Sequence, residues 1–592
     1  MNFLKNLLKN VLTGVLSFFL SIFLIIMILS FISALFSPDT EEKITVKPKS
    51  ILHIDNLSII DDRDSKPSDF MFNFEIPIPL PIPLIDNSKI EEKISLRTFE
   101  RIITLAKDDE NIEAIYLNFN NVSISFNKAE KVRSILKEFK ESKPIYSYSE
   151  LYSKGAYYLS SVADFIAISP PGFISVSGYG ISEFFYKDLF NELGIKIQLF
   201  RVGEYKGAAE SFVRTNFSDE NKEQYLDLLN YRFNNYLENI SESRNINTED
   251  LLDMINNYEA ELSEDALKNN LVDDLIYEDQ MVEYLKEKVD SSYQKISLLK
   301  YNRSLKKVNK YNKNKIAVLY AIGGIMPGKG DDGIYSETII DNIKKIKKNK
   351  NIKSVILYVN SGGGSAFASD LITRELELLQ KEKPLTVYMS DVCASGGYYI
   401  SMPADTLIAS EGSIVGSIGV FGIIPELSGL VKEKLKISID HIKTNKNTGE
   451  IDFFRPLNDD EEKLIQRGIN QVYVDFLNVV SKGRNIETQE VDKLARGKVY
   501  YGDEGKAINL IDIIGNFNDA IDIAAKLGNL EKYQIIEYPK QKTELQKILS
   551  SLSETKYVFN PLVKETDNWL INSLIKDKRF DPIQMRMELN ID

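Results

Sequence analysis

Two related stretches decide the fold of this chain: residues 389–401, MSDVCASGGYYIS, and residues 150–160, ELYSKGAYYLS. Each contains a Tyr-Tyr pair and is soon followed by Ala-Asp. A shift of 241 residues superposes the two stretches and aligns further positions outside them. The aligned pairs are Asp164 with Asp405, Tyr157 with Tyr398 and Arg214 with Arg455. A repeat near this length predicts two large homologous domains.

The two copies differ where chemistry is expected. The same shift places Lys154 opposite Ser395, and Asn447 opposite Lys206. The later half therefore carries a serine that the earlier half lacks, and the earlier half carries a lysine that the later half lacks. This pattern indicates a duplicated scaffold with one active site divided between the copies.

Composition narrows the class of protein. Of 592 residues, 43% are hydrophobic and 27% are charged, as in ordinary globular proteins. A net charge of -13 disfavours nucleic acid as a partner. The single cysteine excludes an intrachain disulfide. The two histidines, His53 and His441, lie in strand-like stretches and are interpreted as structural, so a Ser-His-Asp triad and a His-rich zinc site are disfavoured. We expect no metal and no cofactor.

An uncharged run, residues 11–36, predicts a transmembrane helix because it exceeds the ~20 residues needed to cross a bilayer. Lysines precede this run and acidic residues follow it, which predicts an N-terminus in the cytoplasm and a body outside it. A cleaved signal peptide is the alternative, although its apolar core is normally ~7–15 residues long. The rest of the chain is expected to be one soluble body.

The body reads as α/β. Strands are expected at residues 114–117 and 355–359, helices at 129–139 and 368–379, and further strands at 165–168 and 406–409. Strands that alternate with helices predict parallel sheets. The expected domain plan is a cytoplasmic N-terminus at 1–10, the anchor at 11–36, an N-terminal domain at 45–300, a Lys- and Asn-rich linker at 301–315, a C-terminal domain at 316–540 and a tail at 541–592.

Residues 69–85 combine apolar residues with alternating prolines. Proline at every second position forbids a helix and a central strand, so an extended ribbon is expected. The sequence leaves three binding places open for this ribbon: another subunit, the membrane surface, or its own domain.

Ser395 is the candidate nucleophile. It precedes Gly396-Gly397 and an aromatic helix, and a helix start offers free N–H groups, beginning with that of Gly396, to an oxyanion. A second glycine-rich turn, residues 360–365 (NSGGGS), follows a buried-type strand. It fits neither a Walker loop nor a Rossmann turn. With histidine scarce, a lysine of lowered pKa is the practical base for the serine.

These motifs, together with residues 416–419 (GSIG) and 203–206 (GEYK), resemble the signal peptide peptidase A family in its long, duplicated, membrane-anchored form. The resemblance runs from the anchor to about residue 540. It implies two tandem domains of the Clp-protease/crotonase type and a Ser-Lys dyad protease. The implied roles are nucleophile for Ser395, general base for Lys206, a hydrogen bond to the lysine for Ser417 and oxyanion donors for Gly363 and Gly396.

The family also implies a setting. Its members degrade hydrophobic signal peptides left in the membrane, and they assemble as dome-like homo-oligomers, which implies a tetramer at the bacterial inner membrane with a periplasmic catalytic body. One departure stands out: the family's usual Ser-Pro-Gly-Gly is Ser-Gly-Gly-Gly at residues 361–364. The lost proline puts the rigidity of that turn in question.

Three alternatives compete with this interpretation. A Cys393 nucleophile with His441 has no local signature to support it. A crotonase-like enzyme acting on acyl-CoA needs neither the serine nor an anchor. A non-catalytic, membrane-tethered scaffold is conceivable because the earlier copy lacks the serine and the glycines.

Overall fold

The computed structural model describes residues 13–14, 17–19, 21–23, 44–59, 63, 92–120, 122–305, 312–445, 447, 451–540 and 583–586. Most of the predicted membrane segment and the whole proline-rich ribbon at 69–85 lie outside these ranges. Within them, no helix has both the length and the apolar character that a membrane crossing requires.

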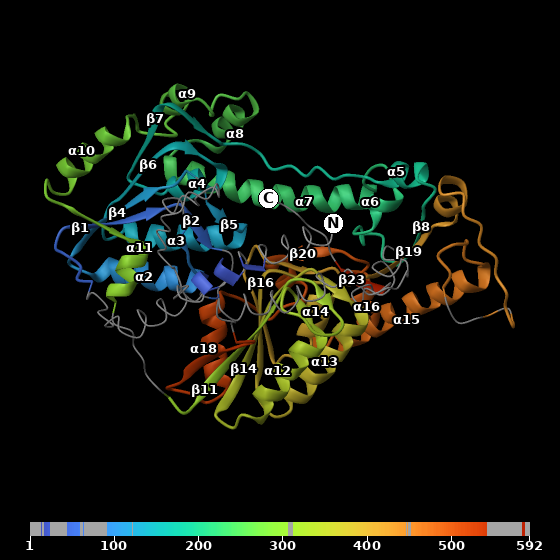
Figure 1. Ribbon diagram of the computed structural model, residues 1–592. Coiled ribbons are helices and arrows are strands. Elements are labelled where there is room, and N and C mark those ends of the chain that lie inside the picture. The colour runs from blue at the N-terminus through green and yellow to red at the C-terminus, as the bar shows by residue number, and fades with distance from the viewer. Residues whose placement is uncertain are drawn as a thin grey trace.

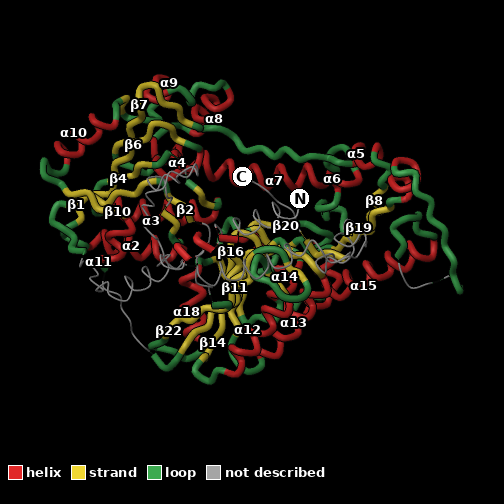
Figure 2. Tube along the Cα trace, viewed as in Figure 1, coloured by secondary structure: helices red, strands yellow, loops and turns green. Residues whose placement is uncertain are grey.

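The first half is built on a parallel sheet, as the strand–helix alternation predicted (Figures 1 and 2). Its strands in spatial order are β10 (Gln294–Ser297), β1 (Ser50–Asp55), β4 (Ile112–Asn118), β6 (Ile145–Tyr152), β7 (Phe165–Ile174) and β9 (Asp274–Leu275). Its helices are α2 (Leu96–Asp108), α3 (Phe126–Lys140), α4 (Lys154–Ser160), α5 (Lys187–Glu192), α6 (Glu210–Val213), α7 (Asp219–Arg244), α8 (Thr248–Asn256), α9 (Ser263–Lys268), α10 (Glu278–Lys288) and α11 (Leu298–Ser304).

The second half repeats this plan with a sheet that is parallel except at its β18–β20 edge. Its strands in spatial order are β20 (Val499–Tyr501), β18 (Ile414–Gly416), β16 (Leu385–Ala394), β14 (Ile352–Ser361), β11 (Lys315–Ile322) and β22 (Gln534–Tyr538), with β17 (Thr406–Ala409) between β16 and β21 (Ile513–Ile514). Its helices are α12 (Ser336–Lys348), α13 (Ala366–Gln380), α14 (Gly396–Ser401), η2 (Leu430–Lys434), α15 (Asp459–Arg484), α16 (Thr488–Leu494), α17 (Gly502–Ala507) and α18 (Phe517–Leu527).

Identical contacts confirm the internal repeat. The hydroxyl of Tyr157 donates to the carbonyl of Leu271 at 2.8 Å, and that of Tyr398 donates to the carbonyl of Leu510 at 2.7 Å. The aligned carboxylates of Asp164 and Asp405 each accept the backbone N–H that opens the neighbouring strand, at 2.8 and 2.7 Å. The aligned tyrosines and aspartates therefore make equivalent contacts in both halves.

Sequence pattern accounts for the helices that cover the sheets. Helix α13 buries Ala368, Ile372, Leu376 and Leu379, a spacing that places one apolar stripe against the core. The hydroxyl of Ser365 begins this helix by accepting the N–H of Ala368 at 3.1 Å. The predicted helices at 129–139 and 368–379 are thus confirmed, each slightly longer than expected.

A third sheet joins the halves. In spatial order it contains β13 (Ile334–Tyr335), β12 (Ile325–Met326), β15 (Gly363–Ser365), β23 (Ile583–Arg586), β19 (Val420–Glu426) and β8 (Lys196–Val202). Strand β8 belongs to the first half and pairs antiparallel with β19 along its whole length, from Lys196 opposite Glu426 to Val202 opposite Val420. A small separate sheet contains β3 (Glu92–Lys93), β2 (Leu57–Ile59) and β5 (Ser123–Ile124).

Helix α7 also bridges the halves (Figure 1). Near its start, the side chain of Gln224 accepts the N–H of Val499 at 2.9 Å, and the carbonyl of Leu228 accepts the Tyr501 hydroxyl at 2.7 Å. The ring of Tyr231 stacks on that of Tyr501 with centroids 3.8 Å apart. The first half therefore contacts the second through both strand β8 and helix α7.

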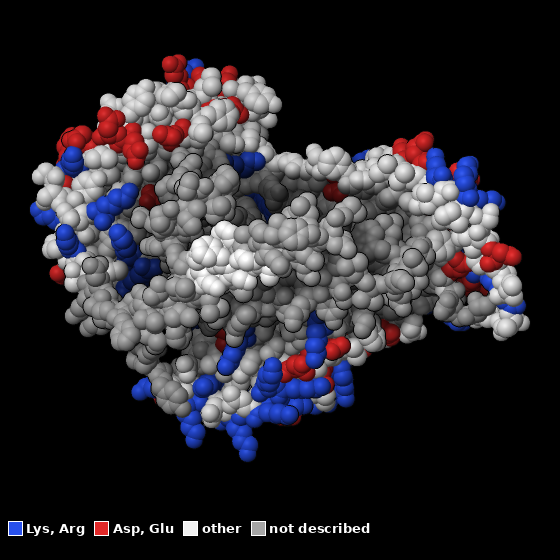
Figure 3. All heavy atoms as spheres, viewed as in Figure 1, with Lys and Arg blue, Asp and Glu red and all other residues white. Residues whose placement is uncertain are grey.

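Charged side chains gather on helices that contribute nothing to the site described below. Figure 3 shows basic residues over α12 and acidic residues over α10. The last turn of α12 carries Lys345, Lys347 and Lys348, and the first turn of α10 carries Glu278 and Asp279. The net negative charge of the chain is thus distributed unevenly.

The two histidines differ in their surroundings. His53 lies in β1 as predicted, is buried, and packs edge-on against Tyr116 with ring centroids 4.7 Å apart. Burial lowers the pKa of His53 to about 3, with the charge of Lys295 acting in the same direction, so the ring is neutral. The strand predicted around His441 is wrong: this residue lies in an irregular stretch and pairs with Asp452 at 3.3 Å.

Candidate active site

Ser395 lies at a sharp turn between β16 and α14. Its backbone has φ 55° and ψ −119°, a conformation that is strained for any residue with a side chain. Ser395 occupies the N-cap position of α14, yet its hydroxyl makes no capping hydrogen bond. The Ser395 hydroxyl thus does not cap the helix. A strained strand-to-helix turn of this kind is how several hydrolases present a nucleophile.

Lys206 reaches Ser395 from the other half. The chain leaves β8, which is paired with β19, and turns at Gly203, where φ is 110°. The N–H of Tyr205 donates to the carbonyl of Arg496 at 3.0 Å and ties this loop to the second half. Sheet pairing between the halves therefore delivers the lysine to the serine.

The amine of Lys206 has three partners. Its Nζ lies 2.7 Å from Ser395 Oγ, 3.0 Å from Ser417 Oγ and 2.9 Å from the carbonyl oxygen of Ser417. A neutral amine has two N–H bonds and one lone pair, so it can donate to both Ser417 oxygens and accept the Ser395 proton.

Burial determines the charge of that amine. Lys206 is 2% exposed, and its desolvation lowers the pKa well below 10.5. Among the described residues, no carboxylate contacts Nζ to oppose this shift. A buried amine without a counter-charge favours the neutral form, which is the form that can act as a base.

Two glycines of the second half make room for the lysine stem. A Cβ on Gly497 would lie 2.5 Å from the backbone N of Lys206, and one on Gly419 would lie 3.3 Å from its Cδ. Gly497 has φ 85°, which disfavours any other residue. Sequence patterns did not predict a role for Gly497, since an isolated glycine in ARGK reads only as a helix end.

The glycine-rich turn packs against Gly396, the residue that follows Ser395. A Cβ on Gly396 would lie 3.2 Å from Gly363 Cα, so the two glycines predicted to be oxyanion donors are adjacent. The N–H of Gly363 donates to Ser361 Oγ at 3.0 Å, and that hydroxyl donates to the carbonyl of Gly323 at 2.7 Å. Ser361 thus fastens the turn from which the family's proline is missing, a contact that the sequence did not reveal.

Cys393 is not placed for chemistry. The thiol is fully buried, lies 3.4 Å from Ser401 Oγ, and has a pKa that burial raises to about 12. A thiol that remains protonated is a poor nucleophile. The Cys393–His441 alternative is therefore not supported.

The equivalent position in the first half holds no nucleophile. Lys154 Nζ donates to the carbonyl of Gly178 at 2.5 Å and lies 4.1 Å from the centre of the Tyr179 ring. Helix α4 starts conventionally, with Ser153 in an extended conformation and its hydroxyl accepting the N–H of Ala156. Of the two equivalent turns, the described structure therefore pairs only Ser395 with a lysine, and that pair is made from both halves.

A serine hydrogen-bonded to a buried lysine on an α/β scaffold characterises a class of serine hydrolases. Comparison with known proteins defines the class further. The sequence pattern of Peptidase family S49 matches residues 137–292 and again residues 377–531.

Individual relatives match along most of the chain. Protease 4 of Haemophilus influenzae is 35% identical over 470 residues, covering 75% of this chain and 75% of that protein. The chloroplastic serine protease SPPA of Arabidopsis thaliana is 29% identical over 490 residues, covering 79% and 71%. A solved structure of the 1510-N membrane-bound stomatin-specific protease, a mutant in complex with a substrate peptide, shares 15% identity and covers 41% of this chain and all of that one, with a TM-score of 0.26 that is too low to support an argument.

The chain belongs to peptidase family S49 and is a serine protease. The resemblance to the long, duplicated form of signal peptide peptidase A is confirmed, since the family pattern occurs twice and the relatives extend across both copies. The acyl-CoA and scaffold alternatives are accordingly set aside.

Proposed function

We propose that this protein is a membrane-anchored endopeptidase that degrades hydrophobic peptides, signal peptides among them, with a Ser395–Lys206 dyad. The observation that carries the proposal is the 2.7 Å contact between Ser395 Oγ and the amine of a fully buried lysine. Burial supplies a neutral base, and the contact directs its lone pair at the serine proton.

The reaction then follows in two stages. Lys206 accepts the Ser395 proton while Oγ bonds to the carbonyl carbon of the scissile peptide, and the carbonyl electron pair moves onto oxygen. The C–N bond breaks as the oxyanion collapses, and the leaving amine takes the proton from Lys206. Water, deprotonated by the same lysine, hydrolyses the acyl-enzyme and restores Ser395.

We assign the oxyanion to the N–H groups of Gly396 and Gly363. The Gly396 N–H lies at the start of α14, where the helix dipole favours negative charge. The Gly363 N–H donates to Ser361 Oγ in the resting structure, so it must turn from that hydroxyl to the oxyanion. Ser417 keeps the amine directed at Ser395 through its hydroxyl and carbonyl oxygens.

The position of strand β23 supports the proposal that the substrate is a peptide. This strand lies between β15 and β19 and pairs antiparallel with both, with Arg586 opposite Gly363 and Gln584 opposite Phe421. Strand β15, which is part of the glycine-rich turn, therefore accepts an extended backbone beside it. A substrate bound as a strand in this place would meet the oxyanion donors directly.

The remaining elements of the proposal follow from the sequence and the family. The anchor is residues 11–36, and the two domains, of the Clp-protease/crotonase type, are residues 45–300 and 316–540, joined by residues 301–315 and followed by the tail at 541–592. The protein lies in the bacterial inner membrane with its N-terminus in the cytoplasm and its body in the periplasm, and it assembles as a homo-tetramer. Exposed apolar residues offer surfaces for such contacts, among them Phe184, Leu189, Leu435 and Ile437.

A fluorogenic hydrophobic peptide tests the proposal. Ser395→Ala and Lys206→Ala should each abolish turnover, and a fluorophosphonate probe should label wild type at Ser395 alone. Lys154→Ala is the matched control, because this lysine holds the equivalent position to Ser395 in the first half and should be dispensable. Turnover in Ser395→Ala, or labelling at another serine, would contradict the assignment.

A further inference from the structure

The strand that leads to Ser395 is interrupted just before it. Strands β14 and β16 pair regularly up to Val359 opposite Met389, and their next pair is Ser361 opposite Cys393. Asn360 therefore faces three residues of β16, namely residues 390–392. Such a bulge bends its strand and redirects the side chains that follow, and here only two residues separate it from Ser395.

Asn360 fastens the bulge from within the second half. Its Oδ1 accepts the N–H of Val392 at 3.2 Å, and its Nδ2 donates to Asp391 Oδ2 at 3.2 Å. Asn360 also directly precedes Ser361 and the glycine-rich turn. One side chain thus connects the strand of the nucleophile to the turn of the oxyanion donors.

The other partners of Asp391 come from the first half. Lys128 forms an ion pair with Asp391 Oδ2, and the hydroxyl of Ser125 donates to Oδ1. The Lys128 side chain is 3% exposed and that of Asp391 is 18% exposed, so the pair is shielded from water. Ser125 holds the N-cap position of α3 but makes no capping bond there, since its hydroxyl serves Asp391 instead.

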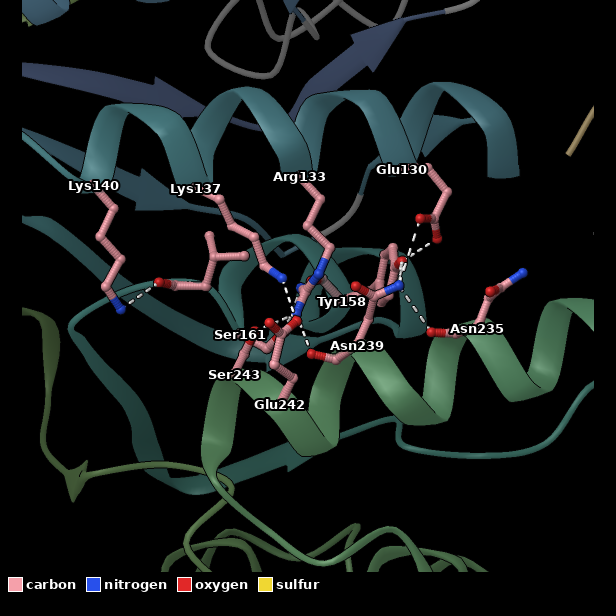
Figure 4. A network of polar contacts seen from close by, with 11 residues as sticks. Glu130, Arg133, Lys137, Lys140, Tyr158, Ser161, Asn235, Asn239, Glu242 and Ser243 are labelled. Atoms are coloured by element: carbon pink, nitrogen blue, oxygen red, sulfur yellow. Dashed lines mark hydrogen bonds and ion pairs between the residues drawn. The ribbon is translucent and has the colours of Figure 1, made fainter. Parts of the chain in front are cut away.

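Helix α3 is a fixed support for this contact. Arg133, one and a half turns further along, is buried and bonded on two sides (Figure 4). One guanidinium nitrogen donates to Ser161 Oγ at 2.6 Å and to the carbonyl of Tyr158, and the other donates to Ser243 Oγ at 2.5 Å and to the carbonyl of Asn239. These bonds hold α3 against α4 and α7, so the position of Lys128 is set by the first half as a whole.

The first half lacks this arrangement. Its equivalent strands, β4 and β6, pair without a shift up to Leu117 opposite Ser147, and the register shift of β6 lies instead toward β7, between Ser149 and Leu151. Glu150, which aligns with Asp391, is exposed and has no ion pair or side-chain hydrogen bond within the described part of the chain. The external lysine is thus present only at the bulge that leads to the nucleophile.

We propose that Lys128 is a positioning residue for catalysis. Through Asp391 and Asn360 it sets the bulge before Ser395 and the turn that carries Gly363. Docking of the first half then does more than supply Lys206, because it also aligns the nucleophile with the oxyanion donors. This inference rests on the proposed Ser395–Lys206 mechanism and gives the contact between the halves a further role in that mechanism.

The test measures acylation, through kcat and the rate of fluorophosphonate labelling, separately from substrate binding, through KM, and from stability. Lys128→Met should lower kcat and the rate of fluorophosphonate labelling about 100-fold, the loss expected from misplacement of a reacting group by ~1 Å, with KM little changed. Lys128→Arg should recover most of the rate, because it restores the charge. Ser125→Ala, a milder change, should lower the rate less. Adding Asp391→Asn to Lys128→Met should cost little more, since the two residues act through one contact.

Two controls match these variants. Lys137→Met removes another lysine of α3 that forms an ion pair, with Glu242, and Glu150→Gln alters the residue that aligns with Asp391. Both should label at the wild-type rate. All rates are taken well below the melting temperature of each variant. The proposal is overturned if Lys128→Met and Ser125→Ala label as fast as wild type, or if Lys128→Arg fails to recover the rate. Failure of wild type to label at Ser395 would instead refute the dyad itself.

Discussion

Replacement of Gly497 by alanine is a sharp test of how the lysine is held. The new Cβ would lie 2.5 Å from the backbone N of Lys206 and 2.8 Å from its Cα. These are backbone atoms, which cannot rotate away. Ordinary contact begins near 3.4 Å, so relief of the 2.5 Å contact requires a shift of about 0.9 Å.

Such a shift has two consequences. Alanine at φ 85° costs about 1–2 kcal/mol, and overpacking costs about 1–3 kcal/mol more, so the unfolding free energy should fall by about 2–5 kcal/mol. The Nζ–Oγ contact of 2.7 Å should also open, because the Lys206 backbone carries the amine with it. A displacement of ~1 Å in a catalytic group is worth about 100-fold in kcat.

Peptide turnover and denaturant unfolding, measured together, check both effects. Gly468→Ala is the control: Gly468 lies inside α15 with nothing within 4 Å of its added Cβ, so the change should stabilise by about 0.5–1 kcal/mol and leave kcat alone. A Gly497→Ala enzyme with wild-type kcat would refute the argument that the absence of a side chain at this position is needed to place Lys206.

Three further predictions concern the site. Activity should fall as the pH drops through the lowered pKa of Lys206. Because the unfolded chain binds that proton more readily than the native state, the unfolding free energy of wild type relative to Lys206→Met should rise with pH up to about 10.5, and a difference that stays constant would contradict the burial argument. Ending the chain after Pro582 removes β23 from its place between β15 and β19 and should raise kcat/KM about tenfold, the worth of one or two net hydrogen bonds. An unchanged kcat/KM would mean that β23 does not compete with substrate. A thiol reagent should leave turnover intact, because Cys393 is fully buried with a raised pKa; inactivation that tracks Cys393 modification would contradict its structural role.

Local patterns were enough to find the nucleophile and the glycine-rich turn, though not the role of the lysine or the contacts that assemble the site. Ser395 and the glycine-rich turn stand out because small residues follow buried strands, a signal confined to a few positions. Lys206 is delivered by pairing of β8 with β19, where Val202 meets Val420, and a pairing over such a sequence distance leaves no local trace. Comparison of the two copies singled out Lys206, but its role as the base came from the family resemblance.

The errors and omissions have similar causes. Apolar residues around His441 suggested a strand, but no neighbouring strand pairs with them among the described residues, and the segment stays irregular. The bulge at Asp391 was not predicted, because a bulge depends on the partner strand and cannot be read from one strand alone. The lysine partner of Asp391, 263 residues away, lies in the other copy of the repeat.

The two copies show what catalysis demands of this scaffold. In the first half, the turn into α4 is relaxed, with a capping serine and extended backbone. In the second half, Ser395 is held at φ 55° with its hydroxyl withheld from the helix, a conformation that costs on the order of 1–3 kcal/mol and persists only where surrounding contacts enforce it. Two of those contacts come from lysines of the first half: Lys128 holds the bulge before Ser395 through Asp391, and the amine of Lys206 contacts the Ser395 hydroxyl. The first copy has Lys154 in place of the serine and needs no such strain, and it serves instead as the support that maintains strain in the other copy.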